Sequence, residues 1–72
     1  MLKGTRPAII KRIQPVSIHG QVSYEVSWAD PDTPEDVRHS RVGPEAVPRN
    51  MEVGDTVTLH FVMGMVSEIT KS

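Results

Sequence analysis

The sequence predicts an all-β fold, a small barrel of five short strands. Apolar and polar residues alternate along residues 21–28 and again along residues 56–63, as in strands with one buried face. Glycine, proline and aspartate interrupt the chain at short intervals, so turns connect the elements. No segment has the periodicity of a long helix. We expect residues 1–72 to form one domain with a small core.

The first half of the chain is expected to form a hairpin. Residues 8–13 mix isoleucine with lysine and arginine, which is typical of a strand that bends or lies at an edge. Pro15 favours an edge because it cannot donate a backbone hydrogen bond. A three-residue connection at residues 19–21 would place Ile18 opposite Val22. The following strand, residues 21–28, has the clearest alternation in this half.

The second half is expected to contribute three strands and one helical turn. Residues 29–36 hold two prolines and four acids, a composition typical of a loop. Pro44 suits the first position of a short helical turn near residues 44–48. Gly64 permits a sharp reversal of the chain. The expected strands are residues 37–42, 56–63 and 65–69.

The motifs VSYEVSWAD, RVGPEAV and EVGDTVTLHF are similar to those of small SH3-like and OB-like β-barrels, in which a Gly-Asp turn often opens a late strand. This resemblance implies a five-stranded barrel of either type. The second half also resembles the small barrel chaperones of hydrogenase maturation, which begin with Met-Cys. Leu2 stands where that cysteine would lie, so their metal chemistry is not implied for this chain.

Two aromatic residues offer alternative interpretations. Tyr24 and Trp28 alternate in phase with Val22 and Val26, which predicts that all four point into the core. Phe61 is expected there too, in phase with the apolar residues of its own strand. If Tyr24 and Trp28 were exposed instead, they would be platforms on which nucleic-acid bases could stack.

The charge pattern bears on nucleic-acid binding. The net charge is −1, with the bases concentrated in residues 1–24 and five acids in residues 25–36. If the first and third strands were neighbours, a basic strip would contact phosphates. Its members would be Lys11, Arg12, Arg38, Arg41 and Arg49. Because the chain is nearly neutral, we nevertheless expect only weak non-specific binding to nucleic acids.

Motifs for catalysis, metal ions and cofactors are absent from the sequence. His19, His39 and His60 lack the spacing of a metal site, and the acidic loop lacks the glycine and final glutamate of a calcium loop. No nucleophile motif or phosphate-binding loop occurs, so we expect neither an enzyme nor a cofactor. An oligomer with a pocket on its symmetry axis would be the exception. Without cysteines, a signal-like segment or a membrane span, the chain is expected in the cytoplasm.

The predicted hairpin tip around Gly64 is apolar. Val62, Met63, Met65 and Val66 flank this glycine, and flexible methionines are frequent at adaptable contact surfaces. The sequence therefore favours a non-catalytic binding module that uses an edge strand and this tip. Its partner would be another protein or a second copy of the chain. The alternative is a nucleic-acid-binding barrel that uses the basic strip and aromatic stacking.

Overall fold

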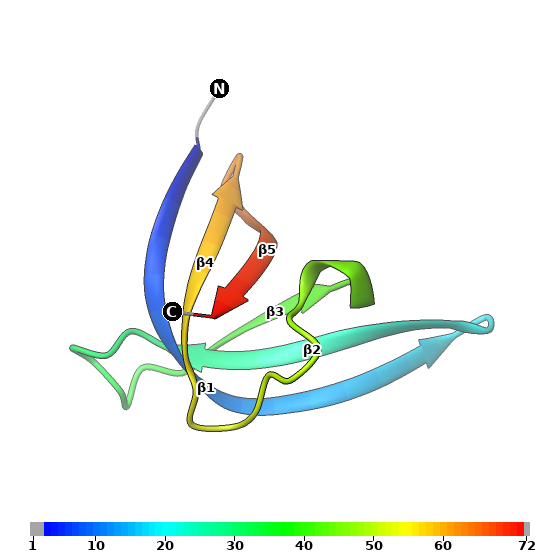
Figure 1. Cartoon of the computed structure of the whole chain (residues 1–72), viewed down its shortest axis with the longest axis horizontal. Helices are drawn as coiled ribbons and strands as arrows, with labels where there is room; N and C mark the ends of the chain where they lie inside the picture. The colour runs from blue at the N-terminus through cyan, green and yellow to red at the C-terminus, as the bar shows by residue number, and fades with distance from the viewer. Residues whose placement is uncertain (1–2, 72) are drawn as a thin grey trace.

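The computed structural model of the chain describes residues 3–71, which form five antiparallel strands in one sheet and one 3-10 turn. The elements are β1 (Lys3–Ile18), β2 (Gln21–Ala29), β3 (Arg38–Val42), η1 (Pro44–Ala46), β4 (Thr56–Val62) and β5 (Met65–Lys71). Their order in the sheet is β3-β2-β1-β4-β5 (Figure 1). The predicted all-β class, the five strands and the helical turn that begins at Pro44 are confirmed.

Strand β1 is much longer than the predicted segment 8–13, and it belongs to both halves of the sheet. Residues 3–9 pair with β4 and residues 9–18 pair with β2. A bulge at Lys11 interrupts the second ladder, and the strand curves strongly along its length (Figure 1). Within residues 3–71, β2 is the only strand paired with β1 after Ile10, so the other side of β1 is an open edge there. Pro15 is tolerated at such an edge because no strand on the open side requires a backbone N–H from it.

The sheet is not closed into a barrel, so an SH3-like or OB-like barrel is not confirmed. β3 and β5 are its two edges, and within residues 3–71 no backbone ladder joins them. Curvature of the sheet nevertheless brings parts of the two strands into contact. Both are short, with five and seven residues, and a groove separates their first residues.

Two hairpins are closed by two-residue turns in the left-handed region. The φ angles are 52° at His19 and 78° at Gly20, and 53° at Met63 and 80° at Gly64. Positive φ at both central residues is the pattern of a type I′ turn, whose twist matches that of the flanking strands. The predicted three-residue connection at residues 19–21 is therefore wrong. Ile18 lies opposite Gln21, and the register differs by one residue from the expected one.

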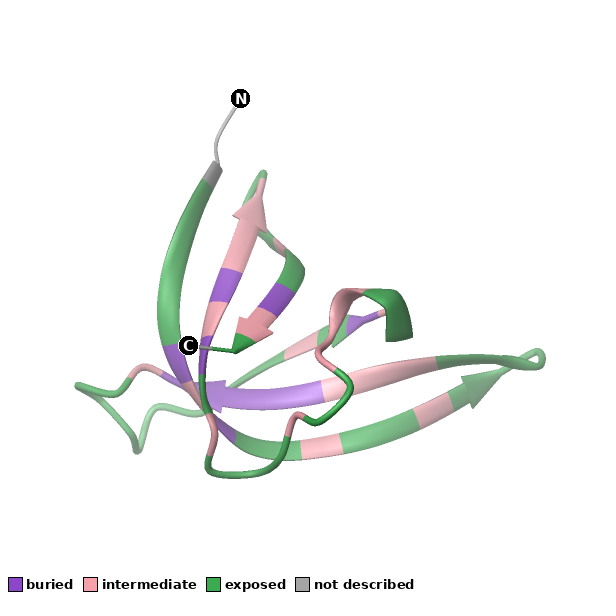
Figure 2. Ribbon diagram, in the orientation of Figure 1, coloured by how far each residue is buried: buried purple, intermediate pink, exposed green. Residues whose placement is uncertain are grey.

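The core lies where the curved β1 crosses between β2 and β4 (Figure 2). Trp28, Val57 and Leu59 are buried as predicted, whereas Tyr24 and Phe61 are only half-buried. Val22 is exposed because the β1–β2 hairpin extends beyond the core (Figure 2). The buried apolar cluster contains Ala8, Ile10, Val26, Trp28, Val42, Val57, Leu59 and Ile69.

Candidate functional site

An open groove of about 520 Å³ lies between β3 and β5. It is lined by residues 38–41 on one side, residues 64–66 on the other, and Arg6, Trp28 and Phe61. Its volume is within the range of about 300–1,000 Å³ that is usual for ligand sites. The groove therefore occupies the seam where the sheet stays open. We refer to this feature as the seam groove.

Two aromatic rings support the seam groove from the core side. The rings of Trp28 and Phe61 meet edge to face, with centroids 6.3 Å apart and an angle of 67° between their planes. Trp28 is only 4% exposed, and its Nε1–H donates to Ser40 Oγ at 3.1 Å. Trp28 thus fixes β2 to β3 and offers no free ring face for stacking on a base.

Arg6 brings a positive charge to the seam groove from β1. Its guanidinium carbon lies 5.9 Å from the centre of the Trp28 ring, and its Nε is 3.7 Å from Asp30 Oδ2. Both contacts restrain the side chain. The predicted basic strip did not include Arg6. Its position depends on the pairing of β1 with β4, which no local sequence signal reveals.

Arg38 and Arg41 lie on β3 at the wall of the seam groove. Arg38 Nη2 is 3.4 Å from Asp36 Oδ2, and Arg41 Nη2 is 3.7 Å from Glu25 Oε2. The four side chains are largely exposed, so each ion pair contributes at most about 1 kcal/mol to stability. These guanidinium groups therefore remain accessible to an external anion.

The predicted five-residue basic strip does not form. Strand β2 separates β1 from β3, so Lys11 and Arg12 are not on a strand adjacent to the one that carries Arg38 and Arg41. Arg49 lies after η1 and lines a different pocket, next to Tyr24. The strip was expected only if the first and third strands were neighbours, and that condition is not met.

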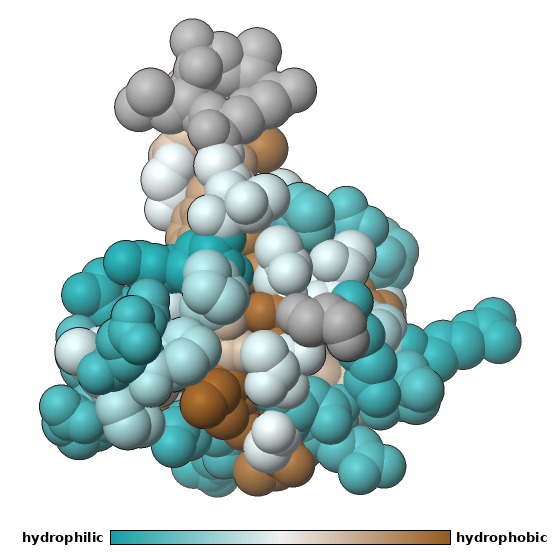
Figure 3. Space-filling view, turned by 60° about the vertical axis from the view of Figure 1, so that its left-hand side comes forward, coloured by the Kyte–Doolittle hydropathy of each residue, from teal (hydrophilic) through white to brown (hydrophobic). Residues whose placement is uncertain are grey.

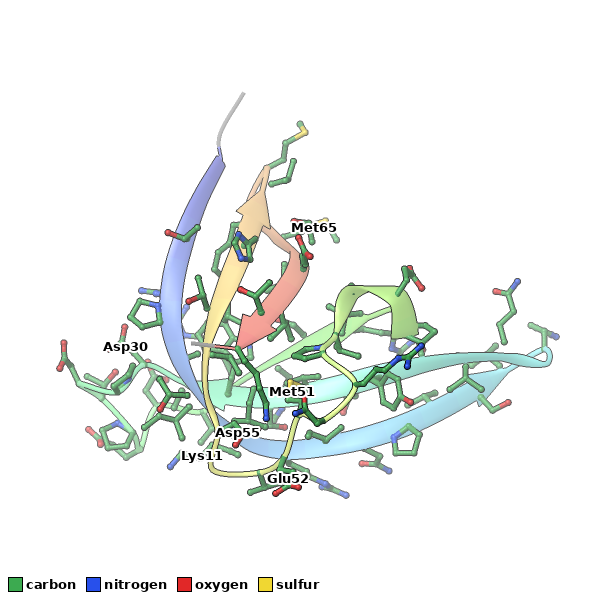
Figure 4. The ribbon with its side chains drawn as sticks, viewed as in Figure 1. Lys11, Asp30, Met51, Glu52, Asp55 and Met65 are labelled. Atoms are coloured by element: carbon green, nitrogen blue, oxygen red, sulfur yellow. The ribbon has the colours of Figure 1, made fainter. Side chains whose placement is uncertain are left out.

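The apolar tip lies at the end of the seam groove. Met63 and Met65 are each 74% exposed, while Val62 and Val66 are half-buried and Val66 packs against the core. Met65 projects from the start of β5, away from the loop that holds Glu52 and Asp55 (Figure 4). Met65 and Val66 also line the seam groove. The tip and the groove therefore form one continuous surface.

The three histidines lie in separate places. His19 is in a turn, His39 Nδ1 is hydrogen-bonded to Ser27 Oγ at 2.8 Å, and His60 Nε2 to Thr70 Oγ1 at 3.0 Å. Across the described residues 3–71, no three side chains of metal-ligating type gather closely enough to hold an ion.

Asp55 has a structural role in the loop before β4. Its Oδ2 accepts the backbone N–H of Glu52 at 2.7 Å and lies 3.3 Å from Lys71 Nζ. The Glu52 hydrogen bond is the main cause that lowers the pKa of Asp55 below its usual value of 3.8. Lys71 adds to this effect, and burial partly opposes it. Asp55 therefore joins the loop to the end of β5.

On the face in Figure 3, polar side chains predominate and apolar side chains form small groups. In the part of the chain that the structure describes, no helix has both the length and the apolar character needed to cross a membrane.

Comparison of the chain with protein-family models, curated proteins and solved structures gave no match. The seam groove and the tip are therefore the basis for assigning a function.

Proposed function

We propose that the chain is a non-catalytic binding module that holds another polypeptide by protein–protein contact. The site is the seam groove together with the tip formed by Val62, Met63, Met65 and Val66. One observation carries this proposal. The edges of β3 and β5, which are not hydrogen-bonded to each other, face each other across a groove that ends at the exposed Met63 and Met65.

Open strand edges favour a polypeptide partner. The outer edge of a strand presents backbone N–H and C=O groups that pair readily with an added strand. Soluble proteins usually protect such edges, and here the charged side chains of Arg38 and Arg41 protect β3 against indiscriminate pairing. A partner that matches these charges would be accepted selectively.

Met63 supports a role for the tip. A non-glycine residue with φ of 53° is strained by roughly 1 kcal/mol, and Asn is preferred at this place in a type I′ turn. The Met63 side chain is 74% exposed, so burial in the core does not offset the strain. His19 has the same positive φ in the other hairpin, so the backbone conformation serves the turn, and it is the exposure of the apolar Met63 side chain that supports contact with a partner.

The proposal also includes the type of barrel and the possibility of self-association. The OB-like type is a partly open five-stranded barrel, which agrees better than a closed barrel with a sheet whose β3 and β5 edges stay apart. A second copy of the chain is one form that the partner can take, because each copy offers the same open edges.

Nucleic-acid binding is the alternative function, and the site supports it less well. Trp28 is buried and the basic strip is divided between separate parts of the fold, so neither aromatic stacking nor a continuous phosphate track supports it. Salt-sensitive binding of a single-stranded oligonucleotide that quenches Trp28 fluorescence would favour this alternative.

Selection from a library of random twelve-residue peptides, displayed and captured on the immobilised chain, tests the proposal. Binders should shift the backbone amide resonances of residues 38–42 and 63–66. The double variant Met63→Ser/Met65→Ser should weaken them, while its free energy of unfolding stays within about 0.5 kcal/mol of wild type. A library that yields no binder to these residues, together with a strict monomer by light scattering, would contradict the proposal.

A further inference from the structure

The walls of the seam groove carry positive charge without acidic residues among them. Arg6, Arg38 and Arg41 line it, and none of its lining residues within the described chain is Asp or Glu. The acids that pair with these arginines lie outside the groove, at 3.4–3.7 Å. An incoming carboxylate would compete with two largely exposed pairs, at Arg38 and Arg41, and with the less exposed Arg6–Asp30 pair. It could bind a guanidinium through two hydrogen bonds.

The width of the seam decides how a partner strand can bind. Neighbouring strands lie about 4.8 Å apart, so a strand bonded to both edges would require about 9.6 Å between β3 and β5. Some Cα atoms of β3 and β5 approach within 8 Å of each other. A partner strand therefore cannot bond to both edges, and it pairs with one edge only along the residues that the groove holds apart. β3 is the edge that carries the charge, and Met65 and Val66 of β5 face it across the groove.

The alternation of β3 fixes where its two arginines point. Arg38 lies opposite Trp28, and Ser40 bonds to Trp28, so both are on the inner face of the strand. Arg41 lies opposite Glu25 on the outer face. Residues directly opposite each other on paired strands point to the same side. A strand added to β3 would thus meet Arg38 on one face and Arg41, three residues along, on the other.

We infer that the seam groove binds an extended segment of another protein with two acidic residues three positions apart, one facing Arg38 and the other Arg41. The residue opposite Ser40 faces inward, toward Trp28 and Phe61, and is apolar. Arg6, held above Trp28, adds attraction for the carboxylate on the inner face. This inference rests on the proposed function and specifies its partner.

The peptide selection tests the inference through the composition of the binders. Peptides selected on the wild-type chain should be enriched in Asp or Glu at positions i and i+3. In the strongest binder, replacement of both acids by Gln should weaken binding at least tenfold, or about 1.4 kcal/mol. Fluorescence anisotropy of the labelled peptide gives the dissociation constants.

A matched pair of variants locates the charge effect. Arg38→Gln/Arg41→Gln should weaken the acidic peptide at least tenfold, whereas Arg12→Gln/Arg49→Gln, which changes the net charge equally, should change binding less than about threefold. Equal loss in both variants would overturn the inference. A stronger affinity for a twelve-residue oligothymidylate than for the peptide would also overturn it. Groove binders without acid enrichment would overturn the inference alone and leave the proposed function standing.

Discussion

At the scale of single residues, Trp28 determines how the site can work. Its ring is buried against Phe61, and its N–H is bonded to Ser40. The same indole therefore stabilises the contact between β2 and β3 and forms part of the seam groove. A change at Trp28 should alter stability as well as binding, so Arg38 and Arg41 are better positions for separating the two.

The bond between Trp28 and Ser40 can be measured by a double-mutant cycle. Ser40→Ala leaves a buried N–H without its partner and should lower the free energy of unfolding by about 1–3 kcal/mol. Trp28→Phe removes that N–H and some apolar area, at a cost of about 1–2 kcal/mol. Because the two share one bond, the double variant should lose less than the sum. Urea unfolding followed by circular dichroism measures this, and strict additivity would contradict the bond.

Asp55 makes stability depend on acid pH. Its pKa is lowered in the folded chain, so its contribution is present above its usual pKa and is lost as the pH falls through the folded value. Asp55→Asn should therefore lower the melting temperature at neutral pH, and the difference from wild type should disappear by about pH 2. Asp32→Asn, in the exposed loop, is the control. A constant difference at every pH would show that charge is not responsible.

At the scale of elements, the strand interiors were predictable and the bend of β1 was not. Alternation is a local pattern, so it placed Trp28, Val57 and Leu59 inside correctly. The curvature of β1 depends on its pairing with two different strands, which are far apart in sequence. Arg6 and the seam groove depend on that curvature. The order of the strands in the sheet is also non-local, so the charge pattern along the chain could not show that β2 lies between β1 and β3.

The two hairpins allow a comparison between a turn outside the proposed site and the turn at the tip. His19 and Met63 both have positive φ next to a glycine, and Asn suits that position better. His19→Asn and Met63→Asn should each stabilise the fold by about 0.5–1 kcal/mol. Only Met63→Asn should weaken the selected peptides, because His19 lies away from the groove. If both variants bind peptides as wild type does, the tip has no part in binding.

At the scale of the whole molecule, the central feature is a sheet that curls without closing. β1, β2 and β4 each have strand neighbours on both sides for part of their length, while β3 and β5 each have one such neighbour within the described chain. The Trp28 and Phe61 rings fill the core side of the seam, so they form the floor of the seam groove.

Amide hydrogen exchange of the free chain, followed residue by residue by NMR, tests the open seam most directly. We expect slow exchange for amides in the β1–β2 and β1–β4 ladders near the core, and rapid exchange for amides on the outer edges of β3 and β5. Addition of a selected acidic peptide should slow exchange along β3. Uniformly slow exchange along both edges in the free chain would mean that β3 and β5 are bonded to each other, so that the barrel is closed and the seam is not open.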